Sequence, residues 1–120
     1  MAKNQTTDVT VSLIDMFPTF QELCGLPQTK QKLEGTSIAS TLAAPDQAKD
    51  RSVFLPHMHP GEYAIINRDW CYIRYGEDGE ELYNLKKDPN EWNNLAGEKK
   101  YARIKSRLAS FAPNKFAPRA

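Results

Sequence analysis

The stretch EELYNLKKDPNEWNNLAG, residues 80–97, decides how the second half of the chain folds. Residues 81–85 are predicted to form a strand, the last of four. Asp88-Pro89-Asn90 predicts a turn after it, because Asp and Asn bond their own backbone and Pro fixes φ. We expect the apolar side chains of Trp92 and Leu95 to pack at the corner that follows this turn. A tryptophan beside two asparagines could also stack on a sugar, which is the alternative for Trp92.

Upstream of this stretch, the sequence predicts three further strands, at residues 52–55, 63–66 and 70–75. Residues 67–69 and 76–79 are tight turns, so the strands should form an antiparallel meander. Downstream, a helix is expected over about residues 98–112, because its apolar side chains recur at helical spacing. This stripe consists of Tyr101, Ile104, Leu108 and Phe111. The expected fold is therefore α+β, a four-stranded antiparallel sheet packed by a C-terminal amphipathic helix.

The first third of the chain predicts a short strand and a short capped helix. Val9, Val11 and Leu13 alternate with polar residues, which is typical of a strand. Asp15 is the expected N-cap of the helix, and Gly25 should close it. Residues 28–50 are expected to be mostly loop, with one helical turn near residues 38–42. The helix should carry one apolar face, made of Phe17, Phe20, Leu23 and Cys24.

Length and charge set further limits. A chain of 120 residues suits one domain, and we expect a disordered segment at 1–8, the domain at 9–112 and a frayed tail at 113–120. The net charge of +1 gives no electrostatic case for binding nucleic acid or a membrane. The basic segment 98–120 is expected to be a solvated helix face, with anion binding as the alternative.

Cysteine content and the N-terminal residues complete this picture. Cys24 and Cys71 lie in apolar surroundings, so buried free thiols are expected, although a disulfide between them remains open. No apolar run approaches the length of a membrane span. The start, MAKNQTTDVT, lacks the apolar middle of a signal peptide, so the chain as written is expected to stay in the cytoplasm.

His57-Met58-His59 is the most conspicuous candidate for chemistry. Two histidines two residues apart could share a metal ion, and Glu62 is the only nearby carboxylate. Pro56, Pro60 and Gly61 instead indicate a loop, so a solvent-facing pair of histidines is the favoured interpretation. The acidic run around Gly79 lacks the spacing of an EF-hand, and it is interpreted as a solvated turn.

Four segments in order resemble the C-terminal end of a sulfatase: SLIDMFPTFQELCGLP, LEGTSIASTL, WCYIRY and ELYNLKKDPNEWNNLAG. The resemblance covers about residues 9–112 and is closest to the iduronate-2-sulfatase-like branch of the alkaline-phosphatase-like superfamily. It implies that a large N-terminal α/β domain holds the chemistry of sulfate ester hydrolysis. In that family a formylglycine, made from the first residue of C/S-x-P-x-R, works beside a calcium ion.

The chain lacks that motif, because Gly25-Leu26-Pro27 follows Cys24 and Tyr72-Ile73-Arg74 follows Cys71. No catalytic or calcium-binding residue can therefore be assigned, and the chain alone is expected to be inactive. The resemblance implies a structural or cleft-completing part of a sulfatase, in which His57 or His59 contacts the sulfated substrate. The expected partner is a sulfatase catalytic domain, in cis or in trans, or a second copy bound through exposed apolar surface. The alternative is a free-standing binding module derived from such a subdomain. For localisation, the resemblance implies that a parent sulfatase is often exported.

Overall fold

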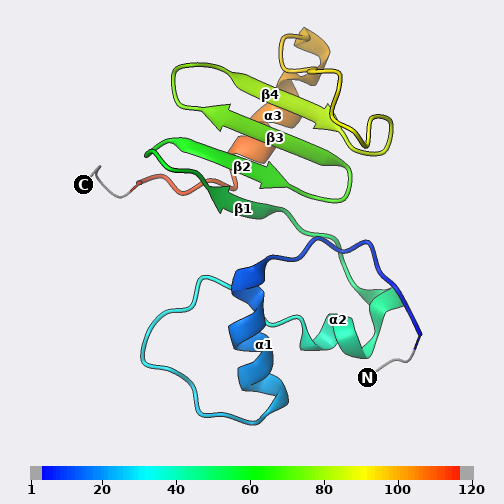
Figure 1. Cartoon of the computed structure of the whole chain (residues 1–120), viewed down its shortest axis with the longest axis vertical. Coiled ribbons are helices and arrows are strands. Elements are labelled where there is room, and N and C mark those ends of the chain that lie inside the picture. The colour runs from blue at the N-terminus through cyan, green and yellow to red at the C-terminus, as the bar shows by residue number, and fades with distance from the viewer. Residues whose placement is uncertain (1–3, 117–120) are drawn as a thin grey trace. The chain divides into compact units, whose positions relative to one another are not determined.

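The computed structural model describes residues 4–116 and divides the chain into two compact units (Figure 1). The N-terminal unit runs to Arg51, and the C-terminal unit begins at Ser52. The boundary between the units lies inside the single domain expected at 9–112, and that domain assignment stays a prediction. The ends of the expected disordered segment and of the expected frayed tail, residues 1–3 and 117–120, lie outside the described residues.

The C-terminal unit contains the predicted sheet. Its strands β1 (Val53–Pro56), β2 (Glu62–Ile66), β3 (Trp70–Tyr75) and β4 (Glu80–Asn84) pair antiparallel in sequence order. A 3₁₀ turn, η3 (Lys99–Tyr101), leads into α3 (Ala102–Ala109), which packs on the sheet (Figure 1). The expected α+β fold class is confirmed.

An apolar core joins α3 to one face of this sheet. Ile65 of β2, Leu82 of β4 and Leu108 of α3 are fully buried. Phe111 was expected on the same stripe, but it is 51% exposed because α3 ends at Ala109, two residues earlier. Beyond it, the Phe116 ring stacks on Tyr63 with centroids 5.9 Å apart.

The chain after β4, residues 85–97, folds back along the free edge of that strand. The Asn94 side-chain oxygen accepts hydrogen bonds from the N–H groups of Leu82 (3.1 Å) and Ala96 (2.9 Å). The Leu95 N–H donates to the Leu82 carbonyl at 2.8 Å, and the Leu95 side chain packs on the core. This return segment pairs the backbone N–H and carbonyl groups of Leu82 at the edge of β4, which would otherwise be open to another strand.

The packing predicted for the Trp92 side chain is wrong, since this side chain is 80% exposed. The turn is held instead by hydrogen bonds to Asp88, whose carboxylate accepts the N–H groups of Trp92 (3.1 Å) and Asn93 (2.8 Å). These two bonds lower the pKa of Asp88. Leu95 and the buried Ala96 therefore anchor this corner to the core.

The N-terminal unit is helical and contains η1 (Leu13–Asp15), α1 (Met16–Leu23), α2 (Ala39–Ala43) and η2 (Pro45–Gln47). The strand predicted over residues 9–13 is wrong. A strand needs a neighbouring ladder, and here the Thr10 N–H donates instead to the Asp50 carboxylate at 3.3 Å. Within residues 4–116, none of the helices has the length and apolar character of a membrane span.

α1 ends as its sequence predicts. Gly25 adopts φ +62°, a left-handed conformation that favours glycine. Its N–H bonds the Glu22 carbonyl at 3.2 Å, and the Leu26 N–H bonds the Gln21 carbonyl at 2.9 Å. This pair of bonds is a Schellman motif, which satisfies the last carbonyls of the helix.

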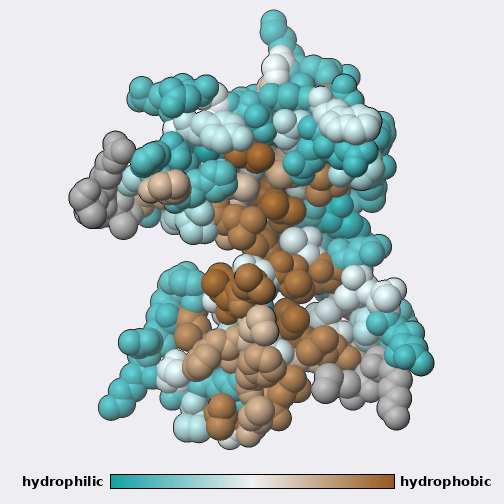
Figure 2. Space-filling model, in the orientation of Figure 1, coloured by the Kyte–Doolittle hydropathy of each residue, from teal (hydrophilic) through white to brown (hydrophobic). Residues whose placement is uncertain are grey.

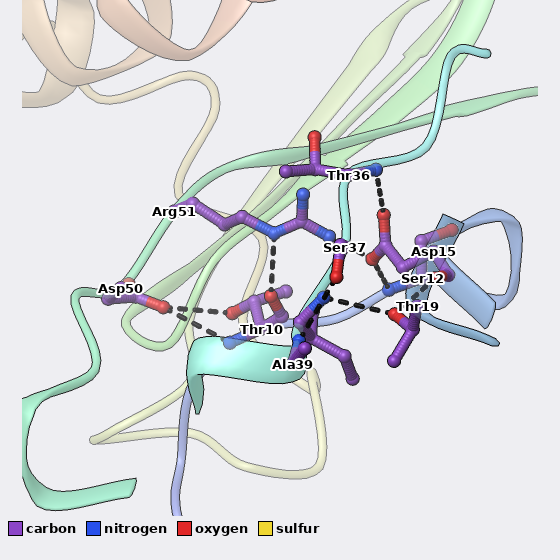
Figure 3. A network of polar contacts seen from close by, with 10 residues as sticks. Thr10, Ser12, Asp15, Thr19, Thr36, Ser37, Ala39, Asp50 and Arg51 are labelled. Carbon is purple, nitrogen blue, oxygen red and sulfur yellow. Dashed lines mark hydrogen bonds and ion pairs between the residues drawn. The ribbon is translucent and has the colours of Figure 1, made fainter. Parts of the chain in front are cut away.

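A buried carboxylate holds the N-terminal unit together (Figure 3). Asp15 is 1% exposed, accepts the N–H groups of Ser12 (2.7 Å) and Thr36 (2.9 Å), and forms an ion pair with Arg51. Asp15 occupies the predicted N-cap position of α1, but its carboxylate makes no capping bond to that helix. It instead ties three separate segments of the unit to one another.

Gly35 allows one of these segments to approach. A Cβ built at this position would lie 2.0 Å from the Ile14 carbonyl oxygen, so a side chain does not fit. The neighbouring Thr36 N–H can therefore reach Asp15. A second bridge runs through Thr19, whose hydroxyl donates to the Asp15 carbonyl at 2.6 Å and accepts the Ile38 N–H at 3.0 Å.

The two cysteines are free thiols in different environments. Cys71 is buried, as expected. The burial expected for Cys24 is wrong, because its side chain is exposed beside the outward apolar face of α1. Figure 2 shows hydrophobic side chains gathered on the surface of the N-terminal unit.

Candidate functional site

The two histidines lie in the turn between β1 and β2. The His57 N–H donates to the Glu62 carbonyl, and the Glu62 N–H donates to the His59 carbonyl, each at 3.0 Å. Gly61 completes the turn with φ +87°, a conformation that L side chains rarely adopt. The solvent-facing loop predicted for this segment is confirmed, since both histidine side chains are exposed.

The turn borders an open depression of about 610 Å³. The His57 ring meets the Tyr75 ring edge-on, with centroids 6.4 Å apart and planes at 65°. Tyr75 is the residue that the sequence reasoning missed. The antiparallel register, in which Glu62 pairs with Tyr75, brings the end of β3 beside the histidine turn. The depression is lined by Pro56, His57, Met58, His59, Glu62 and Tyr75.

The polar groups around this depression are mostly donors. Partial burial and the Glu81 carboxylate, with which the Tyr75 side chain forms a hydrogen bond, raise the pKa of Tyr75. The imidazole N–H groups of the two histidines suit an anionic oxygen. Glu62 is the one carboxylate in the lining, and its charge opposes an anion. The arrangement can bind and orient an anion, but it offers no nucleophile with a matched base.

A larger depression, of about 770 Å³, lies in the N-terminal unit between α1 and residues 25–37. Its lining is mainly amides, hydroxyls and short apolar side chains. Its two charged residues, Glu22 and Lys32, are exposed, and no histidine or aromatic ring faces it. The histidine turn is therefore the better candidate site.

The residues present do not fit the formylglycine and calcium of a sulfatase. Among residues 4–116, no cluster of three or more His, Cys, Asp or Glu side chains could hold a metal ion. Burial, with Glu91 nearby, raises the pKa of the Cys71 thiol to about 12, so it is an inert structural thiol. Cys24 is exposed but is followed by Gly25-Leu26-Pro27 rather than by x-P-x-R.

Comparison with known proteins gives matches along most of the chain. Residues 1–112 match the family described as N-sulphoglucosamine sulphohydrolase, C-terminal. The Δ4,5-hexuronate-2-O-sulfatase of Bacteroides thetaiotaomicron is 34% identical in an alignment of 105 positions that covers 80% of this chain and 21% of that protein. Arylsulfatase K of Xenopus laevis is 27% identical in an alignment of 114 positions that covers 82% of this chain and 21% of that protein.

Solved structures agree with these matches. A 2-O GAG sulfatase is 30% identical with a TM-score of 0.63, over 81% of this chain and 22% of that one. The phosphonate monoester hydrolase of Agrobacterium radiobacter shares the fold, with a TM-score of 0.62 at 22% identity, over 81% of this chain and 23% of that one. This chain thus spans about a fifth of the length of the curated relatives it matches.

Proposed function

Because the chain belongs to the family of sulfatase C-terminal domains, we propose that it is the non-catalytic part that completes a sulfatase. One observation carries this proposal: the family match covers residues 1–112, yet C/S-x-P-x-R occurs nowhere in the 120 residues. The formylglycine and the calcium ion then belong to a separate catalytic part of the enzyme. The assignment to the iduronate-2-sulfatase-like branch stays a prediction.

Within such an enzyme, the histidine turn contacts the substrate. His57 and His59 are exposed at the end of the β1–β2 hairpin, and the Tyr75 ring lies edge-on to the His57 ring. Imidazole N–H donors suit the oxygens of a sulfate ester, because the negative charge of the acceptor strengthens the hydrogen bond. The turn supplies binding and orientation, because bond cleavage needs groups that this chain does not contain.

A chimera tests the completion of the enzyme. The Δ4,5-hexuronate-2-O-sulfatase of B. thetaiotaomicron would receive this chain in place of its own C-terminal fifth, and hydrolysis of that enzyme's own substrate would be measured. We expect the chimera to be active and the 120-residue chain alone to be inactive. A folded chimera without activity, or an active isolated chain, would contradict the proposal.

The histidines are tested in the same chimera. His57→Ala with His59→Ala should raise KM about tenfold with kcat within about twofold, because ground-state contacts to the substrate are lost. Lys87→Ala, which removes another exposed basic side chain away from the turn, should leave both constants unchanged. An unchanged KM in the double histidine variant would exclude the turn from substrate binding.

A further inference from the structure

The apolar face of α1 points away from its own unit. Phe17 is 54% exposed, Phe20 53% and Leu23 46%. The inward positions of the same helix are polar, since Thr19 is 5% exposed and Gln21 is 4% exposed. A helix that folded only against its own unit would show the reverse arrangement.

Hydrogen bonds hold the helix in this orientation. The Thr19 hydroxyl bridges the Asp15 carbonyl and the Ile38 N–H, at 2.6 and 3.0 Å. The Gln21 amide donates to the Pro27 carbonyl. The helix therefore cannot turn its phenylalanines inward without breaking both contacts.

The outward patch is broad and uncharged. Glu22, the only charged residue of α1, is two positions from Phe20 and so lies off the patch. Exposed apolar side chains that gather in one patch are typical of an interaction site. The apolar α1 patch consists of Leu13, Ile14, Met16, Phe17, Phe20, Leu23 and Leu26, all exposed.

We infer that the apolar α1 patch is the docking surface for the catalytic part of a sulfatase, an inference that rests on the proposed function. Two observations favour this occupant. The curated relatives carry about four-fifths of their length outside the matched region, and the matched family is a C-terminal one, so the remainder precedes the segment that contains α1. The absence of charge on the patch also suits a protein interior-like surface rather than a nucleic acid or an anionic ligand.

Cys24 gives a direct readout of coverage. Its exposed thiol is seven positions from Phe17, on the same side of the helix, whereas Cys71 is buried in the C-terminal unit. The rate of alkylation by iodoacetamide would be measured at each cysteine by peptide mass spectrometry, in the isolated chain and in the chimera. We expect Cys24 to react at least tenfold more slowly in the chimera and Cys71 to react slowly in both.

Phe17→Gln with Phe20→Gln should restore fast alkylation of Cys24 in the chimera. The matched control removes two exposed aromatic rings from the C-terminal unit, Trp92→Gln with Phe111→Gln, and should leave Cys24 protected. Far-UV circular dichroism of the isolated variants should match the parent chain, because all four side chains are exposed.

The outcomes separate the inference from the function on which it rests. An active chimera with Cys24 as reactive as in the isolated chain would overturn the docking surface and leave the proposed function standing. An inactive chimera with reactive Cys24 would overturn both. Protection of Cys24 in the isolated chain that rises with protein concentration would assign the patch to a second copy and would also overturn the inference.

Discussion

The two units of this chain are built by opposite means. The C-terminal unit buries Ile65, Leu82 and Leu108 and leaves its charges outside. The N-terminal unit buries Asp15 and Thr19 instead, and its aromatic side chains face outward. Apolar burial is the dominant stabilising contribution in folding, so the C-terminal unit has what it needs to be stable alone. The N-terminal unit is held by polar contacts and leaves most of its large apolar side chains exposed.

The largest expected effect breaks the apolar core of the C-terminal unit. Leu108→Ala should lower the free energy of unfolding by about 4 kcal/mol, because it removes a fully buried side chain and leaves a cavity between α3 and the sheet. Urea unfolding followed by tryptophan fluorescence would measure it, since Trp70 packs on this core. Phe111→Ala, just beyond the same helix, should cost less than about 0.5 kcal/mol. Similar costs for the two variants would refute the assignment of the core.

Loss of the buried carboxylate should break the other unit. Asp15→Ala leaves Arg51 and the N–H groups of Ser12 and Thr36 without their acceptor, at a cost of about 3 kcal/mol. Limited proteolysis should then cut the N-terminal unit while the C-terminal unit stays intact. Unchanged protection of residues 10–51 would show that the polar network does not hold this unit. Cleavage throughout the chain would show that the units do not unfold separately.

The smallest expected effect is a pH dependence confined to the C-terminal unit. Lys105 donates to Glu80 and to the Ala96 carbonyl, and the Tyr72 hydroxyl donates to Glu80 at 2.8 Å. The hydrogen bond from Lys105 is the main cause that lowers the pKa of Glu80 below its ordinary value of 4.5. A carboxyl whose pKa is lower in the folded state stabilises the fold above the unfolded pKa, and this contribution is lost as pH falls through the folded value.

Stability of the C-terminal unit should therefore decline below about pH 4.5, the range in which Glu80 becomes protonated. Glu80→Gln should reduce that decline, whereas Glu77→Gln, an exposed carboxylate in the neighbouring turn, should not. Urea titrations at several pH values would compare them. If the free energy of unfolding fell equally with pH in all three proteins, Glu80 would not be the cause of the decline.

Local patterns predicted the C-terminal unit well because its elements satisfy one another in sequence order. Turn residues such as Asn67, whose side chain accepts the N–H groups of Asp69 and Trp70, act within a few positions. The helical spacing of apolar residues also predicted correctly that the side chains from Tyr101 to Leu108 on this stripe pack in the core. The error at Trp92 arose because Trp92 and Leu95 are both apolar and lie close together in the sequence. Apolar character alone does not tell which of the two side chains is buried in the core.

The N-terminal unit was harder to predict for a physical reason. Alternation at Val9 and Val11 indicates a strand, but a strand forms only where a neighbouring ladder exists. The role of Asp15 depends on Thr36 and Arg51, which are 21 and 36 positions away. Tyr75 joined the histidine turn through strand register rather than through any local motif. Contacts of this range leave no short signal in the sequence.

Hydrogen exchange of the 120-residue chain tests the contrast between the two units most directly. Backbone amides of Ile65, Tyr72 and Leu82 should exchange only through global unfolding of the C-terminal unit. Amides of Thr36 and Ile38, bonded to Asp15 and Thr19, should exchange at least a hundredfold faster in the isolated chain. Equal protection in both units would show that the N-terminal unit is complete without a partner and would contradict the account.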